Sequence, residues 1–303
     1  MKILITGASG LVGKALVRKL KKNNTLYTPP HKKLDLLNDK KVDSYIKLKK
    51  PDLVIHAAGK VGGILYNMRN QKDFLIENQK MGFNLINSCY KNNVLKVINL
   101  ASSCIYPKIF NGKISEKKLL TGPLEPTNEG YALAKISCLK LCSYLNNSKN
   151  NIEYKTIIPC NIFGIDDNFK DINAHLVPSI IRKFNKLKKK KKNSAITIWG
   201  TGKAKREFMF ADYFADIINF LIKKIEDVPD ILNIGTGRDY TILEYYKKIA
   251  KIYNLKPRYI FDLSKPEGMK RKLLNINQLK KLGWKKKHDI DHYLKITVKK
   301  NEK

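Results

Sequence analysis

The chain lacks several features that would place it in a membrane or in an oxidising compartment. None of its apolar runs approaches the ~20 residues that a membrane-spanning helix needs. It has no signal-peptide pattern, because a strand-like run starts at the second residue and a Gly-rich turn follows directly. We therefore expect a cytoplasmic protein that does not associate with a membrane.

Cysteine is scarce and unpatterned. The five cysteines are an odd number without Cys-x-x-Cys spacing, so neither a disulfide framework nor a zinc site is indicated and we expect no metal. They are Cys89, Cys104, Cys138, Cys142 and Cys160.

Acidic residues are also few: 26 Asp and Glu stand against 60 Lys and Arg, which gives a formal charge of +34. Such a charge suggests a nucleic-acid partner. However, only seven of the basic residues are arginine, the preferred residue for bidentate recognition of bases and phosphates, and no nucleic-acid-binding motif occurs. The dense lysine run 186–192 is typical of a solvated helix end, with an acidic partner as the alternative. We expect no nucleic acid, and a charge that attracts anionic ligands.

Short apolar runs alternate with longer amphipathic runs in the first half of the chain. This alternation predicts βαβ units and an α/β fold with a Rossmann-like, doubly wound parallel sheet, which binds ligands at the carboxyl ends of its strands. The predicted strands are 2–6, 26–28, 52–56, 96–101 and 154–158, and the predicted helices are 11–22, 39–49, 73–92 and 131–146.

The pattern becomes irregular after Pro159. A helix is predicted at 175–189, a strand at 196–199, a helix from Asp212 and a strand at 231–234. We expect one domain from residues 1–160 plus about 208–236. The remaining parts, about 161–207 and 237–303, are expected to form a smaller C-terminal α/β lobe.

A Gly-x-x-Gly-x-x-Gly segment lies between the first predicted strand and the first predicted helix. Gly7 permits a tight turn, Gly10 lets the backbone approach a pyrophosphate, and Gly13 lets the helix pack closely on the strand. The pyrophosphate then meets the free N–H groups of a helix N-terminus. A turn without a ligand is the alternative. The segment predicts dinucleotide contacts from Gly7, Ser9, Gly10, Leu11, Val12 and Gly13.

The end of the second predicted strand favours NADP over NAD. An NAD site needs a carboxylate there to accept from the ribose 2′-hydroxyl. Residues 27–33 contain no acid and three possible cations, which would hold a 2′-phosphate. We expect His31 and Lys32 to contact that phosphate, and Asp35 and Leu36 to border the adenine.

Tyr131 and Lys135 are four residues apart and share one face of a predicted helix. A nearby ammonium favours tyrosinate, so we expect it to lower the pKa of the phenol towards a value useful for proton transfer. The preceding strand ends at Ser102, whose hydroxyl could bond the same substrate oxygen. Tyr-x-x-x-Lys alone is common on surfaces, but with this serine and the glycine turn it indicates hydride transfer at a carbonyl or carbinol carbon.

These motifs, together with residues 159–164 (Pro-Cys-Asn-Ile-Phe-Gly), resemble the extended short-chain dehydrogenases. Further segments are similar to GDP-L-fucose synthases, in order and over nearly the whole chain: 56–64, 102–108, 167–169, 175–178, 199–200, 206–208, 265–268 and 271–274. The resemblance implies further NADP contacts, from Ala57, Ala58, Leu100, Ser102, Tyr131, Lys135, Pro159, Asn161, Ile162 and His175.

The resemblance implies a two-part reaction. GDP-4-keto-6-deoxy-D-mannose is epimerised at C3 and C5 and then reduced at C4 by NADPH, which gives GDP-L-fucose. Ser102 and Tyr131 would bond the C4 oxygen, and Lys135 would hold the ribose. Cys104 and His175 would exchange the C3 and C5 protons, since both side chains titrate near neutrality. Without this context, Cys104 is interpreted as a small buried hydrophobic residue and His175 as a helix-start or surface histidine.

The resemblance also implies a homodimer and a set of nucleotide-sugar contacts. Arginines would bind the diphosphate and Trp199 would stack, with Trp199 in the core as the alternative. Asn275 stands where the family commonly has Asp, and only Asp212 remains of two common aspartates. The expected contacts are Lys60, Val61, Gly62, Arg182, Trp199, Arg206 and Asn275.

Two other classes of function compete. One is another nucleotide-sugar epimerase, dehydratase or ketoreductase of the same superfamily, although the absence of an acid after Ser103 disfavours dehydration. The other is a dinucleotide-sensing or RNA-binding protein on a Rossmann fold, because a fold alone does not fix a function. The complete set of Ser102, Tyr131 and Lys135 argues against a binding protein.

Overall fold

The computed structural model describes residues 1–109, 112–148, 151–169, 174–189, 195–265 and 267–302. The first half alternates strands with helices. Its elements are β1 (Lys2–Thr6), α1 (Leu11–Leu20), β2 (Thr25–Tyr27), α2 (Asp39–Lys49), β3 (Leu53–His56), α3 (Ile64–Arg69), α4 (Gln71–Lys91), β4 (Lys96–Leu100), the short 3-10 helices η1 (Ser103–Ile105), η2 (Glu116–Lys118) and η3 (Pro126–Asn128), α5 (Glu129–Ser148) and β5 (Glu153–Pro159).

The second half has shorter strands and a less regular order. Its elements are β6 (Asn161–Phe163), α6 (Leu176–Lys188), β7 (Ala195–Trp199), β8 (Lys205–Arg206), β9 (Phe208–Phe210), α7 (Ala211–Ile222), η4 (Ile225–Asp227), β10 (Ile231–Ile234), β11 (Tyr240–Thr241), α8 (Ile242–Tyr253), β12 (Arg258–Asp262), β13 (Arg271–Lys272), α9 (Asn277–Lys281) and α10 (Ile290–Asn301).

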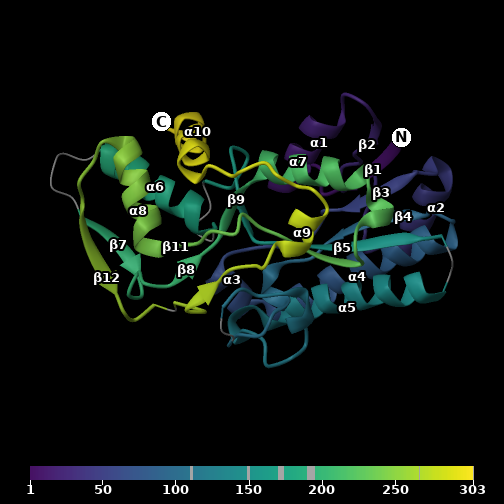
Figure 1. The fold of residues 1–303 in the computed structure, drawn as a ribbon, viewed down its shortest axis with the longest axis horizontal. Coiled ribbons are helices and arrows are strands. Elements are labelled where there is room, and N and C mark those ends of the chain that lie inside the picture. Colours follow the sequence, from purple (N-terminus) through teal and green to yellow (C-terminus); the bar gives the residue numbers. More distant parts are fainter. Residues whose placement is uncertain (110–111, 149–150, 170–173, 190–194, 266, 303) are drawn as a thin grey trace.

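Within the described residues, six parallel strands form the main sheet in the order β10-β5-β4-β3-β1-β2. Both faces are covered, which explains why its inner strands read as continuous apolar runs. Ile3 and Ile5 pack against the layer of α1 and α7, and Leu4 packs against the layer of α2, α4 and α5. Figure 1 shows these helix layers on opposite sides of the sheet.

A smaller lobe adjoins the carboxyl ends of the strands. It contains the parallel pair β7 and β12, the strands β8, β11 and β13, and the helices α6 and α8. Figure 1 shows this lobe on the left, with α10 packed above it. The short parallel pair of β6 and β9 connects the lobe to the sheet.

The predicted fold class is confirmed. The predicted strands of the sheet lie within two residues of the observed ones, and helix 39–49 matches α2. The sequence missed α3, which is short and is separated from α4 by Asn70 alone, and it missed α8, α9, α10, β12 and β13. Residues 170–173, 190–194 and 266 lie outside the described residues, so the end of the lysine run 186–192 and part of the segment 265–268 are not placed.

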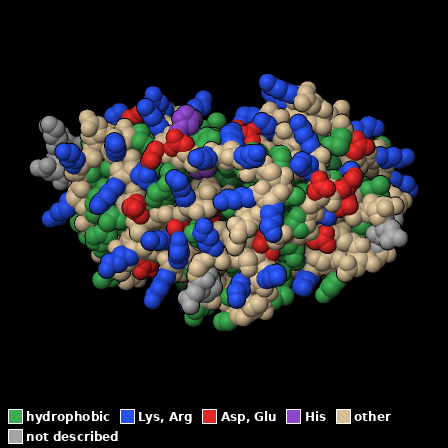
Figure 2. Space-filling view, viewed as in Figure 1, with side chains coloured by type: hydrophobic (Ala, Val, Ile, Leu, Met, Phe, Trp, Pro, Cys, Tyr) green, Lys and Arg blue, Asp and Glu red, His purple; other side chains and the backbone are tan. Residues whose placement is uncertain are grey.

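Positive charge is distributed over the molecule. Figure 2 shows lysine and arginine side chains scattered across the whole visible face, with acidic side chains between them, and no single basic patch. Among the parts of the chain that the structure describes, no helix combines the length and apolar character needed to cross a bilayer.

Candidate active site

The glycine turn is sterically fixed at two of its three glycines. Gly7 has φ +68°, and a Cβ there would lie 2.7 Å from the Cα of Ala58 at the end of β3. A Cβ on Gly13 would lie 2.1 Å from the carbonyl oxygen of Gly7. A Cβ on Gly10 would meet only that same oxygen, at an ordinary 3.4 Å. The space over Gly10 is therefore open to a ligand.

The N-terminus of α1 suits a pyrophosphate. Gly10 is its N-cap residue and provides no side-chain cap, so the backbone N–H groups of the first turn have no intrahelical partner. Ser9 and Gly10 are exposed, and Leu11 and Val12 are half-buried. An anion at this position would be stabilised by the helix dipole and by the free N–H groups. The turn thus fits the predicted dinucleotide.

The segment after β2 presents cations and one acid. His31 and Lys32 are exposed, and the Nε2 of His31 lies 3.4 Å from the Oδ1 of Asp35. The side chain of Leu36 is buried in the core, and its carbonyl accepts from the side chain of Asn84 at 2.8 Å. The side chain of Leu36 is therefore part of the core, and its predicted adenine contact stays a prediction.

A buried histidine joins the ends of β1 and β3. The Oγ1 of Thr6 lies 3.0 Å from the Nδ1 of His56 and accepts from the backbone N–H of Ala58 at 3.3 Å. Burial, together with the charge of Lys135, lowers the pKa of His56 to about 3, so its ring is neutral. This bond fixes Ala57 and Ala58, two predicted cofactor contacts, against the glycine turn.

The loop that carries the predicted sugar contacts Lys60, Val61 and Gly62 is tied to α4. Buried Asn78 accepts from the backbone N–H of Lys60 at 2.9 Å and donates to its carbonyl at 3.1 Å. The ammonium of Lys60 lies 2.6 Å from the Oε1 of Glu77, so it must leave this ion pair to bind a substrate. Val61 is exposed, and the carbonyl of Gly62 accepts from Asn67.

Four of the predicted catalytic residues meet at the carboxyl end of β4. Lys135 donates to the carbonyl of Leu100 at 2.9 Å, and its Nζ lies 5.7 Å from the centroid of the Tyr131 ring. The Oγ of Ser102 accepts from the backbone N–H of Cys104 at 3.4 Å. This edge of a parallel sheet is where α/β proteins bind their ligands.

The phenol does not show the predicted lowering of its pKa. Burial raises the pKa of Tyr131, and the neighbouring Cys104 and Cys138 raise it further. The ammonium of Lys135 bonds a carbonyl and faces the ring rather than the hydroxyl, and burial lowers the pKa of Lys135 itself. Tyr131 is therefore a neutral phenol with a proton to donate.

Cys104 is a protonated thiol in a positively charged setting. Burial raises its pKa, while the charge of Lys272, a hydrogen bond with Ser102 and the charge of Lys135 act in the opposite direction. Only 4% of the residue is exposed. The two lysine charges offset part of the cost that burial adds to the thiolate, which suits reversible proton exchange.

His175 is the N-cap residue of α6, where its side chain is exposed. Although the residue is accessible to water, the protein that surrounds this position lowers the pKa of His175, which favours the neutral imidazole. Residues 170–173, which lead into this position, lie outside the described residues. The predicted partnership of His175 with Cys104 stays a prediction.

The residues of the smaller lobe that we expect to contact the sugar nucleotide differ in their surroundings. The guanidinium of Arg206 donates to the carbonyls of Met269 at 2.6 Å and Glu267 at 3.0 Å. Trp199 ends β7 with 38% of its surface exposed, so its placement in the core, the alternative, is wrong. The Oδ1 of Asn275 accepts from the N–H of Asn277 at 2.9 Å, in the turn that leads into α9.

Arg182 lies on α6, half-buried, with Lys183 beside it. Pro159 ends β5, and Asn161 and Ile162 lie in β6. The side chain of Asn161 donates to the carbonyl of Glu207 at 2.9 Å. The cofactor contacts predicted here stay predictions.

The sequence missed a buried carboxylate that connects these elements. Glu207 is fully buried, and its Oε1 accepts from the N–H groups of Thr236 at 2.5 Å and Gly237 at 2.7 Å. Its Oε2 accepts from the N–H of Leu274 at 3.0 Å. Glu207 thus fixes the segments next to Arg206 and Asn275. Its motif carried the resemblance, but its neighbours, far along the chain, gave no local signal.

A second missed residue is Lys272. It lies in β13, paired with Arg206 of β8, and its charge reaches Cys104. Burial lowers the pKa of Lys272. The run 271–274 was part of the resemblance, but its spacing did not indicate which side chain faces the site.

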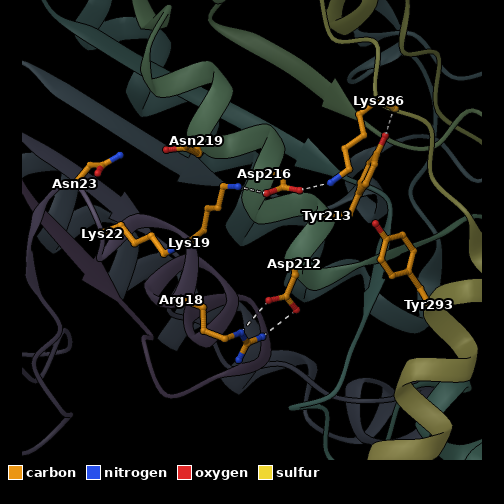
Figure 3. Close-up of a pocket in the computed structure, with 10 residues that line it drawn as sticks. All are labelled: Arg18, Lys19, Lys22, Asn23, Asp212, Tyr213, Asp216, Asn219, Lys286 and Tyr293. Carbon is orange, nitrogen blue, oxygen red and sulfur yellow. Dashed lines mark hydrogen bonds and ion pairs between the residues drawn. The ribbon is translucent and has the colours of Figure 1, made fainter.

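A polar depression of about 540 Å³ lies elsewhere, over α1, α7 and the segment before α10. Figure 3 shows its ion pairs: Arg18 binds Asp212, at 2.8 Å, and Asp216 lies between Lys19 and Lys286. None of the predicted site residues lines it. These ion pairs join α1 and the segment before α10 to α7. Among the described residues, no group of three or more His, Cys, Asp or Glu side chains could hold a metal ion.

Comparison with known proteins decides the family. The model of the NAD dependent epimerase/dehydratase family matches residues 3–235. The chain belongs to this family. Within it, the chain is 47% identical over 292 residues to GDP-L-colitose synthase of Yersinia pseudotuberculosis, with 96% of this chain and 94% of that protein covered. It is 41% identical to GDP-L-fucose synthase of Azorhizobium caulinodans, with 98% and 95% covered.

Solved structures of GDP-sugar enzymes are similar to the chain over nearly its whole length. A GDP-mannoheptose C4 reductase of Campylobacter jejuni with NADP bound superposes with a TM-score of 0.88 at 29% identity, covering 100% of this chain and 98% of that one. A GDP-L-fucose synthetase of Naegleria fowleri gives 0.87 at 25% identity, with 98% and 92% covered. The resemblance to GDP-L-fucose synthases and the prediction of an enzyme are confirmed.

Proposed function

We propose that this enzyme converts GDP-4-keto-6-deoxy-D-mannose to GDP-L-fucose, by epimerisation at C3 and C5 and reduction at C4 with NADPH. The observation that carries the proposal is the meeting of Ser102, Cys104, Tyr131 and Lys135 at the end of β4. A ketoreductase needs the serine, tyrosine and lysine. A buried thiol beside them adds a group that can exchange protons next to the ketone.

NADP(H) is the cofactor, and several features support this. The glycine turn and the uncapped N-terminus of α1 suit a pyrophosphate, and His31 and Lys32 follow β2 where a 2′-phosphate needs cations. A relative with NADP bound superposes over the whole chain. We assign NADP binding to residues 1–160 plus about 208–236, and the nucleotide sugar to about 161–207 and 237–303.

The chemistry follows from the protonation of the site. Ser102 and Tyr131 would donate to the C4 oxygen, which lowers the energy of the enolate formed when a proton leaves C3 or C5. Cys104 and His175 would remove and return those protons on opposite faces of the ring. NADPH supplies the hydride to C4, and the neutral phenol of Tyr131 gives its proton to the oxygen. Lys135 would orient the cofactor ribose.

A second candidate is the formation of GDP-L-colitose, and the 47% identity to a GDP-L-colitose synthase favours it. Colitose lacks the 3-hydroxyl of fucose, so its formation needs epimerisation at C5 only. The ratio of kcat/KM for GDP-4-keto-6-deoxymannose and for its 3-deoxy counterpart separates the two functions.

Product analysis by NMR in deuterated water tests the proposal. Wild type should give GDP-fucose with deuterium at C3 and C5. Cys104→Ser should lose epimerisation and its deuterium exchange, while Tyr131→Phe should lose reduction and keep a slower exchange, because Ser102 still donates to the C4 oxygen. Cys89→Ser, at a buried cysteine on the opposite layer of the sheet, controls for the loss of a thiol. Full turnover by both site variants would contradict the assigned roles.

We further propose a cytoplasmic homodimer. Five free, buried cysteines suit a reducing compartment. The paired helices α4 and α5 carry exposed apolar side chains, Ile76 at 42%, Leu133 at 42% and Tyr144 at 64% exposure, which suit a second copy of the chain. Light scattering should give twice the mass of 34.8 kDa, and Leu133→Glu should reduce it to that of one chain.

A further inference from the structure

Glu125 is a buried acid without a partner. Only 6% of the residue is exposed, and its Oε2 is fully buried with no hydrogen bond to any residue that the structure describes. A buried charge without hydrogen bonds is costly, and such groups are rare in folded proteins. An unpaired buried carboxylate therefore indicates that its partner is absent from the chain itself.

Glu125 lies at the junction of the two lobes. It precedes η3, which packs against α3. The first residue of α3, Ile64, is near Arg206: a Cβ built on Gly268 would lie 3.9 Å from the Cδ1 of Ile64 and 3.2 Å from the Nη2 of Arg206. The same junction receives Lys272, which pairs with Arg206 across β13 and β8.

Glu125 lies within electrostatic range of two cations, one of which also acts on the thiol of the proposed catalytic site. The charges of Arg206 and Lys272 both respond to Glu125, and Lys272 also responds to Cys104. Yet neither cation forms an ion pair with Glu125 within 4.0 Å among the described residues. The acid and the thiol thus both lie within electrostatic range of the same buried lysine, and the acid also lies within range of Arg206.

The negative charge of a carboxylate determines which part of a nucleotide sugar can lie beside Glu125. A carboxylate accepts hydrogen bonds and repels phosphate, whereas Arg206 and Lys272 attract phosphate. Two more buried acceptors without a partner, the Oδ1 atoms of Asn67 and Asn128, lie on α3 and η3. These three acceptors receive no hydrogen bond from the described residues, and the hydroxyls of a sugar are donors that could supply one.

We propose that the carboxylate of Glu125 accepts hydrogen bonds from ring hydroxyls of the hexose and so holds the sugar between Cys104 and the cations that take the diphosphate. The inference rests on the proposed function, because it requires a nucleotide sugar as the ligand. Either oxygen can serve, since the terminal torsion of glutamate is broad and its two oxygens are equivalent.

The affinities for GDP and GDP-mannose, measured by calorimetry on the NADP⁺-loaded protein, separate the hexose from the nucleotide. A hydrogen bond to a charged group corresponds to a change in affinity of about 10- to 100-fold. Glu125→Ala should weaken GDP-mannose by this factor and leave GDP equal or tighter. Glu125→Gln, which keeps the shape and one acceptor oxygen, should weaken GDP-mannose about 5-fold and decides the matter if the alanine variant does not fold.

Glu267→Gln is the matched control. It removes another carboxylate near Arg206, but one whose Oε1 already accepts from Thr201 at 2.5 Å. It should shift both affinities by the same factor. An equal shift of both ligands in the Glu125 variants would overturn the inference, because the acid would then act only on the cations. If wild type bound neither ligand, the proposed function itself would fail.

Discussion

Adding one methyl group at Gly13 should separate the fold of the glycine turn from its ligand binding. The Cβ of Gly13→Ala would lie 2.1 Å from the carbonyl oxygen of Gly7 and 2.6 Å from the Cα of Ala8. Unstrained contacts of this kind need about 3.5 Å, so α1 must move away from β1 by about 1 Å. Both obstacles are backbone atoms, which cannot rotate aside.

The expected cost follows from this overlap. Forcing a methyl group into a packed interior costs about 1–3 kcal/mol, and a clash with backbone belongs at the upper end. About 3 kcal/mol corresponds to a fall in melting temperature of roughly 6–12 °C. Gly10→Ala provides the contrast, since its Cβ meets only one atom, at 3.4 Å, and its φ of −79° suits alanine. Its stability should stay equal or rise slightly.

Thermal unfolding with and without NADPH measures both effects. Gly13→Ala should melt lower without ligand. Gly10→Ala should melt like wild type without ligand but lose most of the stabilisation by NADPH, because its methyl occupies the approach of the pyrophosphate. A Gly13→Ala protein that melts within about 2 °C of wild type, or a Gly10→Ala protein that NADPH stabilises fully, would refute this reasoning.

Three more outcomes are expected. Burial lowers the pKa of Lys135, so the ammonium should be lost, and reduction should fall, at a lower pH than for an ordinary lysine; Lys135→Arg should move this alkaline limit upward in a pH–rate profile. Glu207→Gln should lower the free energy of unfolding by about 2 kcal/mol in urea titrations, because both carboxylate oxygens face N–H donors and an amide can satisfy only one side. Raising the salt concentration should increase KM for the nucleotide sugar several-fold in steady-state assays, since a formal charge of +34 attracts anions through a screened field; an unchanged KM would contradict this.

The sequence predicted the sheet and the turn well for physical reasons. Strands buried on both faces must be apolar throughout, and the glycine turn has steric requirements that few residues meet. The four-residue spacing of Tyr131 and Lys135 likewise places both on one helix face. These features are local, so a short stretch of sequence contains them.

The rest depends on contacts between distant segments. Lys272 reaches the site because β13 pairs with β8, and strands of two residues leave no periodicity in the sequence. The burial of Glu125 and the lack of a hydrogen-bond partner at its Oε2 become visible only in the folded structure, where η3 packs against α3. The pKa of Tyr131 was wrongly predicted, because burial outweighs a lysine that bonds a backbone carbonyl.

Neighbouring strands of the sheet are not always neighbours along the chain, so some are synthesised long before their partners. The outer neighbour of β5 is β10, which the ribosome completes only after the whole segment 160–230 has emerged. Until then the nascent chain exposes an apolar strand edge that can pair with another copy. A product that stops before residue 231 should therefore aggregate more readily than the full chain.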